Sequence, residues 1–411
     1  MTTHVLTGAT GFVGSHLLAD LLSNDPTSTV YALARGDSQH PAAERVQAAL
    51  DVAGYDPSDG RGPTVPSDSR GPTVPSDSRG PTVPSDSRGP TVPSDGRGPI
   101  VVESELTEPL CGVTPDSLPP GDGPLVFWHL AASLQWRRGQ REQVFRTNVD
   151  GTRHALELAK SLGADLFVYM STAYTCGSVQ GDIAEELHRP ASFSNVYEES
   201  KCAAEHLVAG FEGPRTLILR PSVIVGSSHD YRPSGSYTGL YGYLSELRRF
   251  KEMLGDSDEA VRYPADRSTR VSFIPVDHVV EDSRAIVAAE LAAPRQDIYH
   301  VSGRSEAAVG EVTDYMLKLL GLQDRLFIID EDFDDPSTFE RFFAKRIDFF
   351  SDYLRREKRF IRNHGPERSV PLHELMKFID AEDEALSAEA RPARRAAPEP
   401  DQLARPHGAA V

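Results

Sequence analysis

The chain has 411 residues, so length alone predicts a large core and two or three structural units. Its 43 Lys and Arg residues against 61 Asp and Glu residues give a formal charge of −18, which argues against nucleic acid or an anionic membrane as a partner. No apolar run approaches the ~20 residues that a membrane span needs. We see no charged-then-apolar leader, and the three cysteines are too widely spaced to form a metal-binding cluster. We therefore expect a cytoplasmic protein without a metal site.

The first informative stretch is residues 4–14. Its apolar start predicts a buried strand, and Gly8, Gly11 and Gly14 follow at G-x-x-G-x-x-G spacing before a helix expected over residues 12–23. Glycines allow a sharp turn and a close approach to a ligand, and the free N–H groups at a helix start favour phosphate. Strand, glycine turn and helix in this order predict a pyrophosphate-binding loop, whereas the glycine spacing alone could also be an ordinary turn.

A second strand is expected over residues 29–35. In dinucleotide-binding folds an acidic residue near this point holds the ribose, and an arginine accommodates a 2′-phosphate. Arg35 therefore predicts NADP. The alternative is NAD, with Asp37 on the ribose and Arg35 facing solvent.

After a helix expected over residues 41–53, the composition changes. Residues 57–101 are five tandem nine-residue units of the type Pro-Ser-Asp-Gly-Arg-Gly-Pro-Thr-Val. Each of the first four units has one apolar residue besides its prolines, and the last has two, which is too little to offset the entropy of ordering. We predict a disordered insertion over residues 57–99, which costs little stability. A nine-residue solenoid is the alternative, but its prolines would interrupt the hydrogen-bond ladder.

Strands and helices then alternate. Further strands are expected over residues 125–133, 166–170 and 215–226, and further helices over 145–161 and 195–208. This order predicts a doubly wound parallel sheet, the Rossmann arrangement, over residues 1–230. Two polar residues lie in its apolar stretches: His129, which we interpret as a core histidine rather than a catalytic one, and Asn148, which needs a polar partner.

Beyond residue 230 the pattern loosens. Residues 231–243 are rich in Gly, Ser and Tyr and suggest a substrate loop. Helices are expected from a cap at Asp277 to about Ala293, and over residues 309–320 and 338–360. We predict a smaller, mostly helical substrate-binding region over 231–385 and a disordered tail over 386–411.

Tyr197 and Lys201 are four residues apart in a predicted helix and share one face. A tyrosine pKa of about 10 suits neutral acid–base chemistry poorly. We expect the Lys201 ammonium, with the positive ring of an oxidised nicotinamide, to lower the pKa of Tyr197. Tyr197 can then exchange a proton with a carbonyl or alcohol oxygen, and Thr172, at a strand end, would donate a second hydrogen bond. By itself, Tyr-x-x-x-Lys is more often a solvated helix face.

Over roughly residues 3–300 these motifs resemble the extended short-chain dehydrogenase/reductase family. The matching motifs are the Thr-Gly-Ala-Thr-Gly-Phe-Val-Gly loop, His-Leu-Ala-Ala at 129, Asn-Val-Asp-Gly-Thr at 148, Tyr197 with Lys201, and Arg-Pro-Ser at 220. Four finer features resemble its male-sterility/fatty acyl reductase and thioester-reductase branch. They are Glu-Leu-Thr-Glu-Pro at 105, Ser-Thr-Ala-Tyr at 171, Tyr-Glu-Glu-Ser-Lys at 197 and Phe-Ile-Pro-Val-Asp at 273.

The resemblance implies a catalytic trio of Thr172, Tyr197 and Lys201, with Lys201 also holding the nicotinamide ribose. The cofactor contacts that it implies come, besides Tyr197 and Lys201, from Gly8, Thr10, Gly11, Phe12, Val13, Gly14, Arg35, Leu106, Ala131 and Pro221. The chain departs from the branch at Glu105, where aspartate is usual, and in its repeats.

The resulting hypothesis is an NADPH-dependent reductase of an acyl thioester, carried on coenzyme A or on a carrier protein, that forms an aldehyde or alcohol. One alternative is the same fold acting on a free ketone, an alcohol or a nucleotide sugar. Another is a non-catalytic NADP-binding protein, against which the Tyr, Lys and Thr set argues.

Overall fold

The computed structural model describes residues 1–56, 98–232, 239–304 and 306–395. The predicted disorder of residues 57–97 and 396–411 lies outside the described residues. In the described part of the chain, no helix has both the length and the apolar character of a membrane span.

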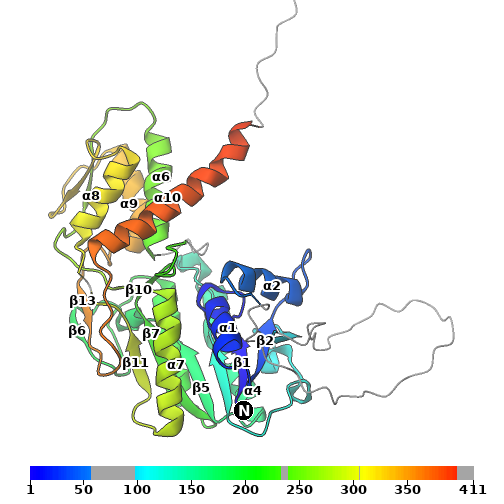
Figure 1. Cartoon of the computed structure of the whole chain (residues 1–411). Coiled ribbons are helices and arrows are strands. Elements are labelled where there is room, and N and C mark those ends of the chain that lie inside the picture. The colour runs from blue at the N-terminus through cyan, green and yellow to red at the C-terminus, as the bar shows by residue number, and fades with distance from the viewer. Residues whose placement is uncertain (57–97, 233–238, 305, 396–411) are drawn as a thin grey trace, which may run out of the picture.

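A seven-stranded parallel sheet forms the centre of the N-terminal part (Figure 1). Its strands lie in the order β11 (Ile298–Val301), β7 (Arg215–Pro221), β5 (Leu166–Met170), β4 (Leu125–His129), β1 (Thr3–Thr7), β2 (Thr29–Ala34) and β3 (Ile100–Glu103). The strand order reverses between β1 and β4, where Thr7 lies beside His129 at matching strand ends. Open parallel sheets bind ligands in the crevice at such a switch point.

Helices cover both faces of the sheet. The first face packs on α1 (Phe12–Asn24), α2 (Ala42–Val52) and α7 (Val276–Ala292), and the second on α4 (Gly151–Ser161) and α5 (Val196–Ala209). Neighbouring strand residues alternate between the faces, so that Leu6 joins the first core and Val5 the second. This arrangement confirms the predicted doubly wound α/β sheet.

Before α4 the chain is helical but irregular. A short helix α3 (Arg141–Phe145) runs into a π-helical turn, η5 (Arg146–Asp150), which leads directly into α4. The helix that the sequence predicts over residues 145–161 is therefore interrupted by a π-turn that contains the buried Asn148. Single π-turns inside helices are frequent at functional sites.

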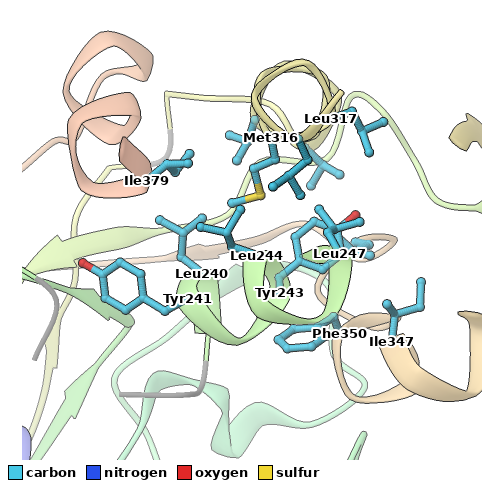
Figure 2. Packing of buried hydrophobic residues seen from close by; sticks show 14 of the residues in the cluster. Leu240, Tyr241, Tyr243, Leu244, Leu247, Met316, Leu317, Ile347, Phe350 and Ile379 are labelled. Carbon is cyan, nitrogen blue, oxygen red and sulfur yellow. The ribbon is translucent and has the colours of Figure 1, made fainter. Parts of the chain in front are cut away.

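The remaining helices form a second core, shown in Figure 2. They are α6 (Gly239–Leu254), α8 (Val309–Leu320), α9 (Thr338–Ile347) and α10 (Leu372–Arg395), and Figure 1 shows them grouped together at one end of the sheet. Leu244 and Leu247 of α6 pack with Met316 and Leu317 of α8.

Short elements complete the chain. Three two-stranded parallel pairs join β8 (Val223–Val225) to β10 (Phe273–Pro275), β9 (Val261–Pro264) to β12 (Leu326–Ile329), and β6 (Gly181–Ile183) to β13 (Lys358–Phe360). The 3₁₀ turns are η2 (Pro109–Gly112), η3 (Pro115–Ser117), η4 (Arg138–Gln140), η6 (Ala173–Cys176) and η7 (Asp348–Phe350).

The structure departs from the sequence-based expectations in four places. The sheet does not end at residue 230, since α7 and β11 complete it. The helix expected over 338–360 ends at Ile347, because β13 pairs with the distant β6. Residues 239–243 begin α6 instead of continuing a loop, because Leu240 and Tyr243 pack into the second core. Residues 386–395 continue α10 instead of joining the predicted tail.

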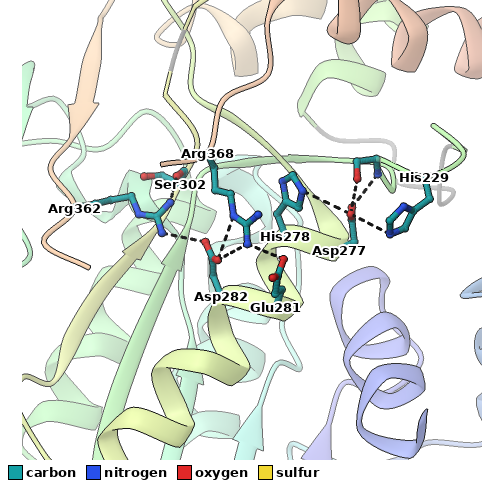
Figure 3. A network of polar contacts seen from close by, with 9 residues as sticks. His229, Asp277, His278, Glu281, Asp282, Ser302, Arg362 and Arg368 are labelled. Atoms are coloured by element: carbon teal, nitrogen blue, oxygen red, sulfur yellow. Dashed lines mark hydrogen bonds and ion pairs between the residues drawn. The ribbon is translucent and has the colours of Figure 1, made fainter. Parts of the chain in front are cut away.

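Polar contacts join α7 to the segment before α10 (Figure 3). The buried Asp282 of α7 accepts hydrogen bonds from Arg362, at 3.0 Å, and Arg368, at 2.8 Å. Asp277 at the start of α7 accepts from the backbone and the hydroxyl of Ser228, at 2.9 and 2.6 Å. Asp277 lies in the first turn of α7, whose N-cap is Pro275, so it holds the loop after β8 and is not the cap that the sequence suggests.

Candidate active site

The glycine loop lies between β1 and α1, at the switch point of the sheet. Gly8 has a φ of +78°, and a Cβ there would lie 2.6 Å from the backbone nitrogen of Ala131. A Cβ on Gly14 would lie 2.0 Å from the carbonyl oxygen of Gly8. The loop therefore packs so closely against the residues after β4 and against its own backbone that only glycine fits at positions 8 and 14.

Helix α1 begins at Phe12 without a side-chain cap on its N-terminal N–H groups, because residue 11 is glycine. These donors and the positive end of the helix dipole are the features that attract a phosphate. The loop thus fits the pyrophosphate of a dinucleotide, in both the space that it leaves and the donors that it offers.

Tyr197 and Lys201 project from the first turns of α5. The Asn195 side chain caps this helix by accepting a hydrogen bond from the N–H of Glu198 at 2.9 Å. The Lys201 ammonium is buried; it donates to the carbonyl oxygen of Met170 at 2.7 Å and lies 4.1 Å from the centre of the Tyr169 ring. Burial lowers the pKa of Lys201 to about 7, against the opposing effect of the Glu205 charge.

Tyr197 differs electrostatically from the expectation. Burial, followed by the charge of the neighbouring Glu198, raises the pKa of Tyr197 above its ordinary value, so the effect expected from Lys201 does not dominate. Tyr197 is therefore a protonated phenol at neutral pH. A phenol in this state can donate a hydrogen bond or a proton to a substrate oxygen, as a reduction requires.

Thr172 is the second residue after β5 and lines the same cavity as Tyr197 and Lys201. Its Oγ1 accepts a hydrogen bond from the N–H of Tyr174 at 3.3 Å, which leaves the hydroxyl proton available to a second acceptor. The preceding Ser171 instead donates to the buried carboxylate of Glu205 at 2.6 Å. Of the two neighbouring hydroxyls, Thr172 is therefore the one free to donate to a ligand.

One cavity of about 310 Å³ brings these parts together. Predicted site residues that line it are Gly8, Gly11, Phe12, Val13, Gly14, Thr172, Tyr197, Lys201 and Pro221. Its far side is apolar and comes from α6, α8 and η7, through Leu240, Val309, Val312, Phe349 and Phe350. The cavity thus runs from the glycine loop, past Tyr197, to an apolar surface of the second core.

Four of the predicted contacts are not among the residues lining this cavity. Thr10 lies within the glycine loop. Ala131 lies beside this loop, two residues after β4, and its N–H donates to Thr7 Oγ1 at 3.4 Å. Leu106 packs against Gly151 of α4. Arg35 lies at the end of β2, where its guanidinium is paired with Glu105 at 3.3 Å. The cavity does not test the predicted cofactor contacts of these four residues, which stay predictions.

His129 is fully buried between two threonines. Its ring nitrogens lie 2.7 Å from Thr7 Oγ1 and 3.0 Å from Thr152 Oγ1, and burial lowers the pKa of His129 to about 3. A neutral histidine held in this way joins β1, β4 and α4. This environment agrees with its interpretation as a core residue.

Sequence reasoning did not assign partners to the polar residues behind the site. Asn148 in the π-turn accepts from the N–H of Ser133 at 2.7 Å and donates to the Ser133 carbonyl at 3.0 Å and to Ser200 Oγ at 2.9 Å. It therefore fastens the chain after β4 to the helix that carries Tyr197 and Lys201.

A buried ion pair supports the site from the other side. Arg220 of β7 donates to Glu205 of α5 through Nε at 2.8 Å and Nη2 at 2.7 Å, and both side chains are 0% exposed. Glu205 also accepts from Ser171, beside Thr172. An arginine inside an apolar strand pattern was the available sequence signal, since a buried charge requires a partner.

The sequence model of the family described as male sterility protein, an NAD-binding domain, matches residues 6–61 and 98–283, more than half of the chain. The gap in this match falls on the nine-residue repeats. Fatty acyl-CoA reductase 1 of Mus musculus is 29% identical over 326 residues, which cover 68% of this chain and 53% of that protein. The chain thus spans about half the length of this curated relative.

Two solved structures share the fold. The terminal R domain from the myxalamid PKS-NRPS biosynthetic pathway has a TM-score of 0.61 and 20% identity, covering 97% of this chain and 93% of that one. A thiolation-reductase di-domain from an archaeal non-ribosomal peptide synthetase has a TM-score of 0.59 and 19% identity, covering 94% and 91%. With the family match and the glycine loop, Thr172, Tyr197 and Lys201 around one cavity, the chain belongs to the male sterility protein family, the fatty acyl reductase and thioester-reductase branch of the extended short-chain dehydrogenase/reductases.

Proposed function

We propose that the protein reduces an acyl thioester with NADPH, on coenzyme A or on a carrier protein, and releases a thiol and an aldehyde that can be reduced again to an alcohol. The observation that carries this proposal is the single cavity that joins the glycine loop, Thr172, Tyr197 and Lys201 to an apolar surface. The names of the relatives support it: a fatty acyl-CoA reductase, a terminal R domain and a thiolation-reductase di-domain.

The residues fit the chemistry of such a reduction. A nicotinamide cofactor, when bound, supplies the hydride. Addition of a hydride to the thioester carbon moves negative charge onto the carbonyl oxygen, which Thr172 and the protonated Tyr197 can stabilise by donating hydrogen bonds. Collapse of this adduct breaks the carbon–sulfur bond, leaving the aldehyde and a thiolate that takes up a proton to become the thiol.

Lys201 would hold the nicotinamide ribose, and its charge would support Tyr197. Its position is fixed by the Met170 carbonyl and the Tyr169 ring. The glycine loop would hold the pyrophosphate, through the uncapped N–H groups of α1.

The apolar side of the cavity favours an acyl chain over a sugar. Leu240, Val309, Val312 and Phe350 face the space beyond Tyr197, and a sugar with many hydroxyl groups would leave its hydrogen bonds unmade against them. An acyl chain would instead gain from the apolar burial. This lining supports a thioester of an apolar acid over the nucleotide-sugar alternative.

Charge at the end of β2 supports NADP over NAD. The carboxylate of Asp37 already accepts hydrogen bonds from the N–H groups of Gln39 and His40, both at 2.8 Å, and lies 3.6 Å from Arg45. A ribose hydroxyl would therefore compete for Asp37 with two backbone hydrogen bonds to Oδ1 and with the Arg45 charge beside Oδ2. Arg35 is mostly exposed, and among the described residues its one ion-pair partner is the half-buried Glu105, so a 2′-phosphate can compete for it.

The test is NADPH oxidation in the presence of acyl thioesters, comparing the wild type with Tyr197→Phe. We expect the variant to bind NADPH but to lose at least about 100-fold in kcat, because the proton donor is removed. Tyr315→Phe is the matched control, since its hydroxyl bonds to Asp380 at 2.6 Å and does not face the cavity. Equal rates for the wild type and Tyr197→Phe would remove Tyr197 from the mechanism.

A further inference from the structure

A second cavity, of about 780 Å³, is lined largely by charged side chains. Its cations are Arg137, Arg138, Arg249, Lys345, Arg346 and Arg356, and its acids are Glu246, Asp348 and Asp352. The lining therefore carries a formal charge of +3, from six cations and three acids, in a chain of −18. We call it the cationic cavity.

Half of these cations already have carboxylate partners. Glu246 pairs with both Arg249 and Arg346, and Asp352 pairs with Arg356 at 2.8 Å. Glu246 and Asp352 are thus neutralised by cations of the same lining. The net positive charge of the cavity comes from the cations that have no such partner.

The unpaired cations are Arg137, Arg138 and Lys345. All three side chains are exposed, and none forms an ion pair with any residue that the structure describes. Asp348 is an acid of the lining that also forms no ion pair within the described ranges. Three free cations against one free acid make an anion the favoured ligand of this cavity.

The cationic cavity adjoins the catalytic cavity along three segments of the chain. Leu134 and Tyr197 line the catalytic cavity, whereas their near neighbours Trp136 and Asn195 line the cationic one. Residues 348–354 alternate in the same way. These three segments therefore contribute residues to both cavities and form their common boundary.

Part of this boundary is a contact between two aromatic rings. The rings of Trp136 and Phe349 lie with their centres 5.2 Å apart, one from each cavity lining. Aromatic side chains of this kind can rotate or shift to admit a narrow, flexible chain. A ligand with an anionic end and a slender arm can span the two cavities at this point.

We propose that the cationic cavity binds the phosphate of the phosphopantetheine arm that presents the acyl thioester, with the arm passing the Trp136–Phe349 contact to reach Tyr197. This inference rests on the proposed function. Coenzyme A and a carrier protein both present the thioester on this arm, so the phosphate is the chemistry they share. The apolar side of the catalytic cavity, formed by Leu240, Val309 and Phe350, cannot solvate that phosphate. The cations Arg137, Arg138 and Lys345 can bind it.

The test is calorimetric titration of the NADPH-saturated protein with 4′-phosphopantetheine and with coenzyme A, so that the dinucleotide site is already filled. The test variant is Arg137→Gln/Arg138→Gln/Lys345→Gln. The control is Lys251→Gln/Arg295→Gln/Lys318→Gln, which removes the same charge from exposed positions outside both cavities. We expect about tenfold weaker binding of both ligands to the test variant only.

Equal binding by the test and control variants, or no binding of phosphopantetheine to the wild type, would overturn the inference. The inference would also be overturned if 4′-phosphopantetheine bound the wild type no better than pantetheine, which lacks the phosphate. If coenzyme A binds and phosphopantetheine does not, the cavity recognises the nucleotide end of coenzyme A instead, and the proposal is wrong.

Kinetics separates this inference from the proposed function. The ratio of kcat/KM for an acyl-CoA to kcat/KM for the matching acyl-N-acetylcysteamine thioester, which lacks phosphate, should fall about tenfold in the test variant. An unchanged ratio, with both thioesters reduced, would refute the phosphate site and leave the proposed function standing. Failure to reduce either thioester would refute the proposed function, while the titrations would still report on the phosphate site. Parallel assays with an acylated carrier protein show whether the acyl group is taken from coenzyme A or from a carrier protein.

Discussion

Replacing Arg220 with methionine should destabilise the protein more than the loss of any exposed ion pair. In the wild type its guanidinium makes two hydrogen bonds to Glu205, at 2.8 and 2.7 Å, and one to the Glu186 carbonyl at 2.8 Å. Both charged side chains are 0% exposed. Arg220→Met leaves the Glu205 carboxylate buried without its cation.

The expected loss in the free energy of unfolding is about 3–5 kcal/mol, the range for breaking a buried pair by removing one partner. Arg220→Met/Glu205→Met removes both charges and should recover stability to within about 2 kcal/mol of the wild type. Arg359→Met is the control: its ion pair with Asp182 is exposed, so its loss should cost at most about 1 kcal/mol.

Urea unfolding followed by tryptophan fluorescence measures these differences, since the chain has two tryptophans and Trp128 is buried in the central sheet. Equal losses for Arg220→Met and Arg359→Met would refute the assigned energy of the buried pair. A double variant that loses the sum of its two single losses would show that the charges are not coupled.

Three further changes test the site. Gly14→Ala should weaken NADPH binding at least about 100-fold in a fluorescence titration, because its Cβ would lie 2.0 Å from the Gly8 carbonyl oxygen, whereas Gly139→Ala, with no atom within 4 Å, should bind normally. Arg35→Ser should raise the Kd of NADPH about tenfold or more while that of NADH changes little; an unchanged preference would return the choice to NAD. Because the pKa of Lys201 is lowered from 10.5 to about 7, its ammonium is lost as the pH rises through 7, so kcat/KM should fall above that pH and Lys201→Arg should flatten the fall. The same shift means that folding disfavours the protonated lysine, so its contribution to stability should grow as the pH rises from about 7 toward 10.5; a pH-independent activity in the wild type would contradict this assignment.

Local patterns in the sequence predicted the sheet and the position of the glycine loop well, because these signals lie within a few residues of one another. The alternation of short apolar strands with helices is a local property, and so is the spacing of Gly8, Gly11 and Gly14. Only the structure shows how closely the glycine loop packs against the residues after β4, where a Cβ at Gly8 would meet the backbone of Ala131. That contact comes from another strand and has no local signature.

The second core was predicted less well, because distant pairings determine its elements. The strand β13 (Lys358–Phe360) exists through its pairing with β6 (Gly181–Ile183), which is remote in sequence. The apolar residues around Phe349 resemble a continuing helix, yet the chain turns there so that Phe349 lines the catalytic cavity. Local periodicity cannot distinguish these outcomes.

In the candidate site, residue types were easier to predict than their electrostatics. Tyr197, Lys201 and Thr172 do line one cavity. The burial that raises the pKa of Tyr197 depends on the whole surrounding fold, and the residues that hold the trio in place, Asn148 and Glu205, act through contacts with distant segments. A sequence indicates that such polar residues need partners, but it does not identify them.

The central claim is that a hydride reaches the carbon of an acyl thioester beside Tyr197, and thiol release measures it most directly. The purified protein should be given NADPH and an acyl-CoA, and free thiol should be titrated against NADPH consumed. We predict one thiol for each NADPH if the product is an aldehyde, or for every two if it is an alcohol, and no thiol release above background with Tyr197→Phe. NADPH oxidation with a ketone or alcohol-forming carbonyl substrate, and no thiol from any thioester, would contradict the account.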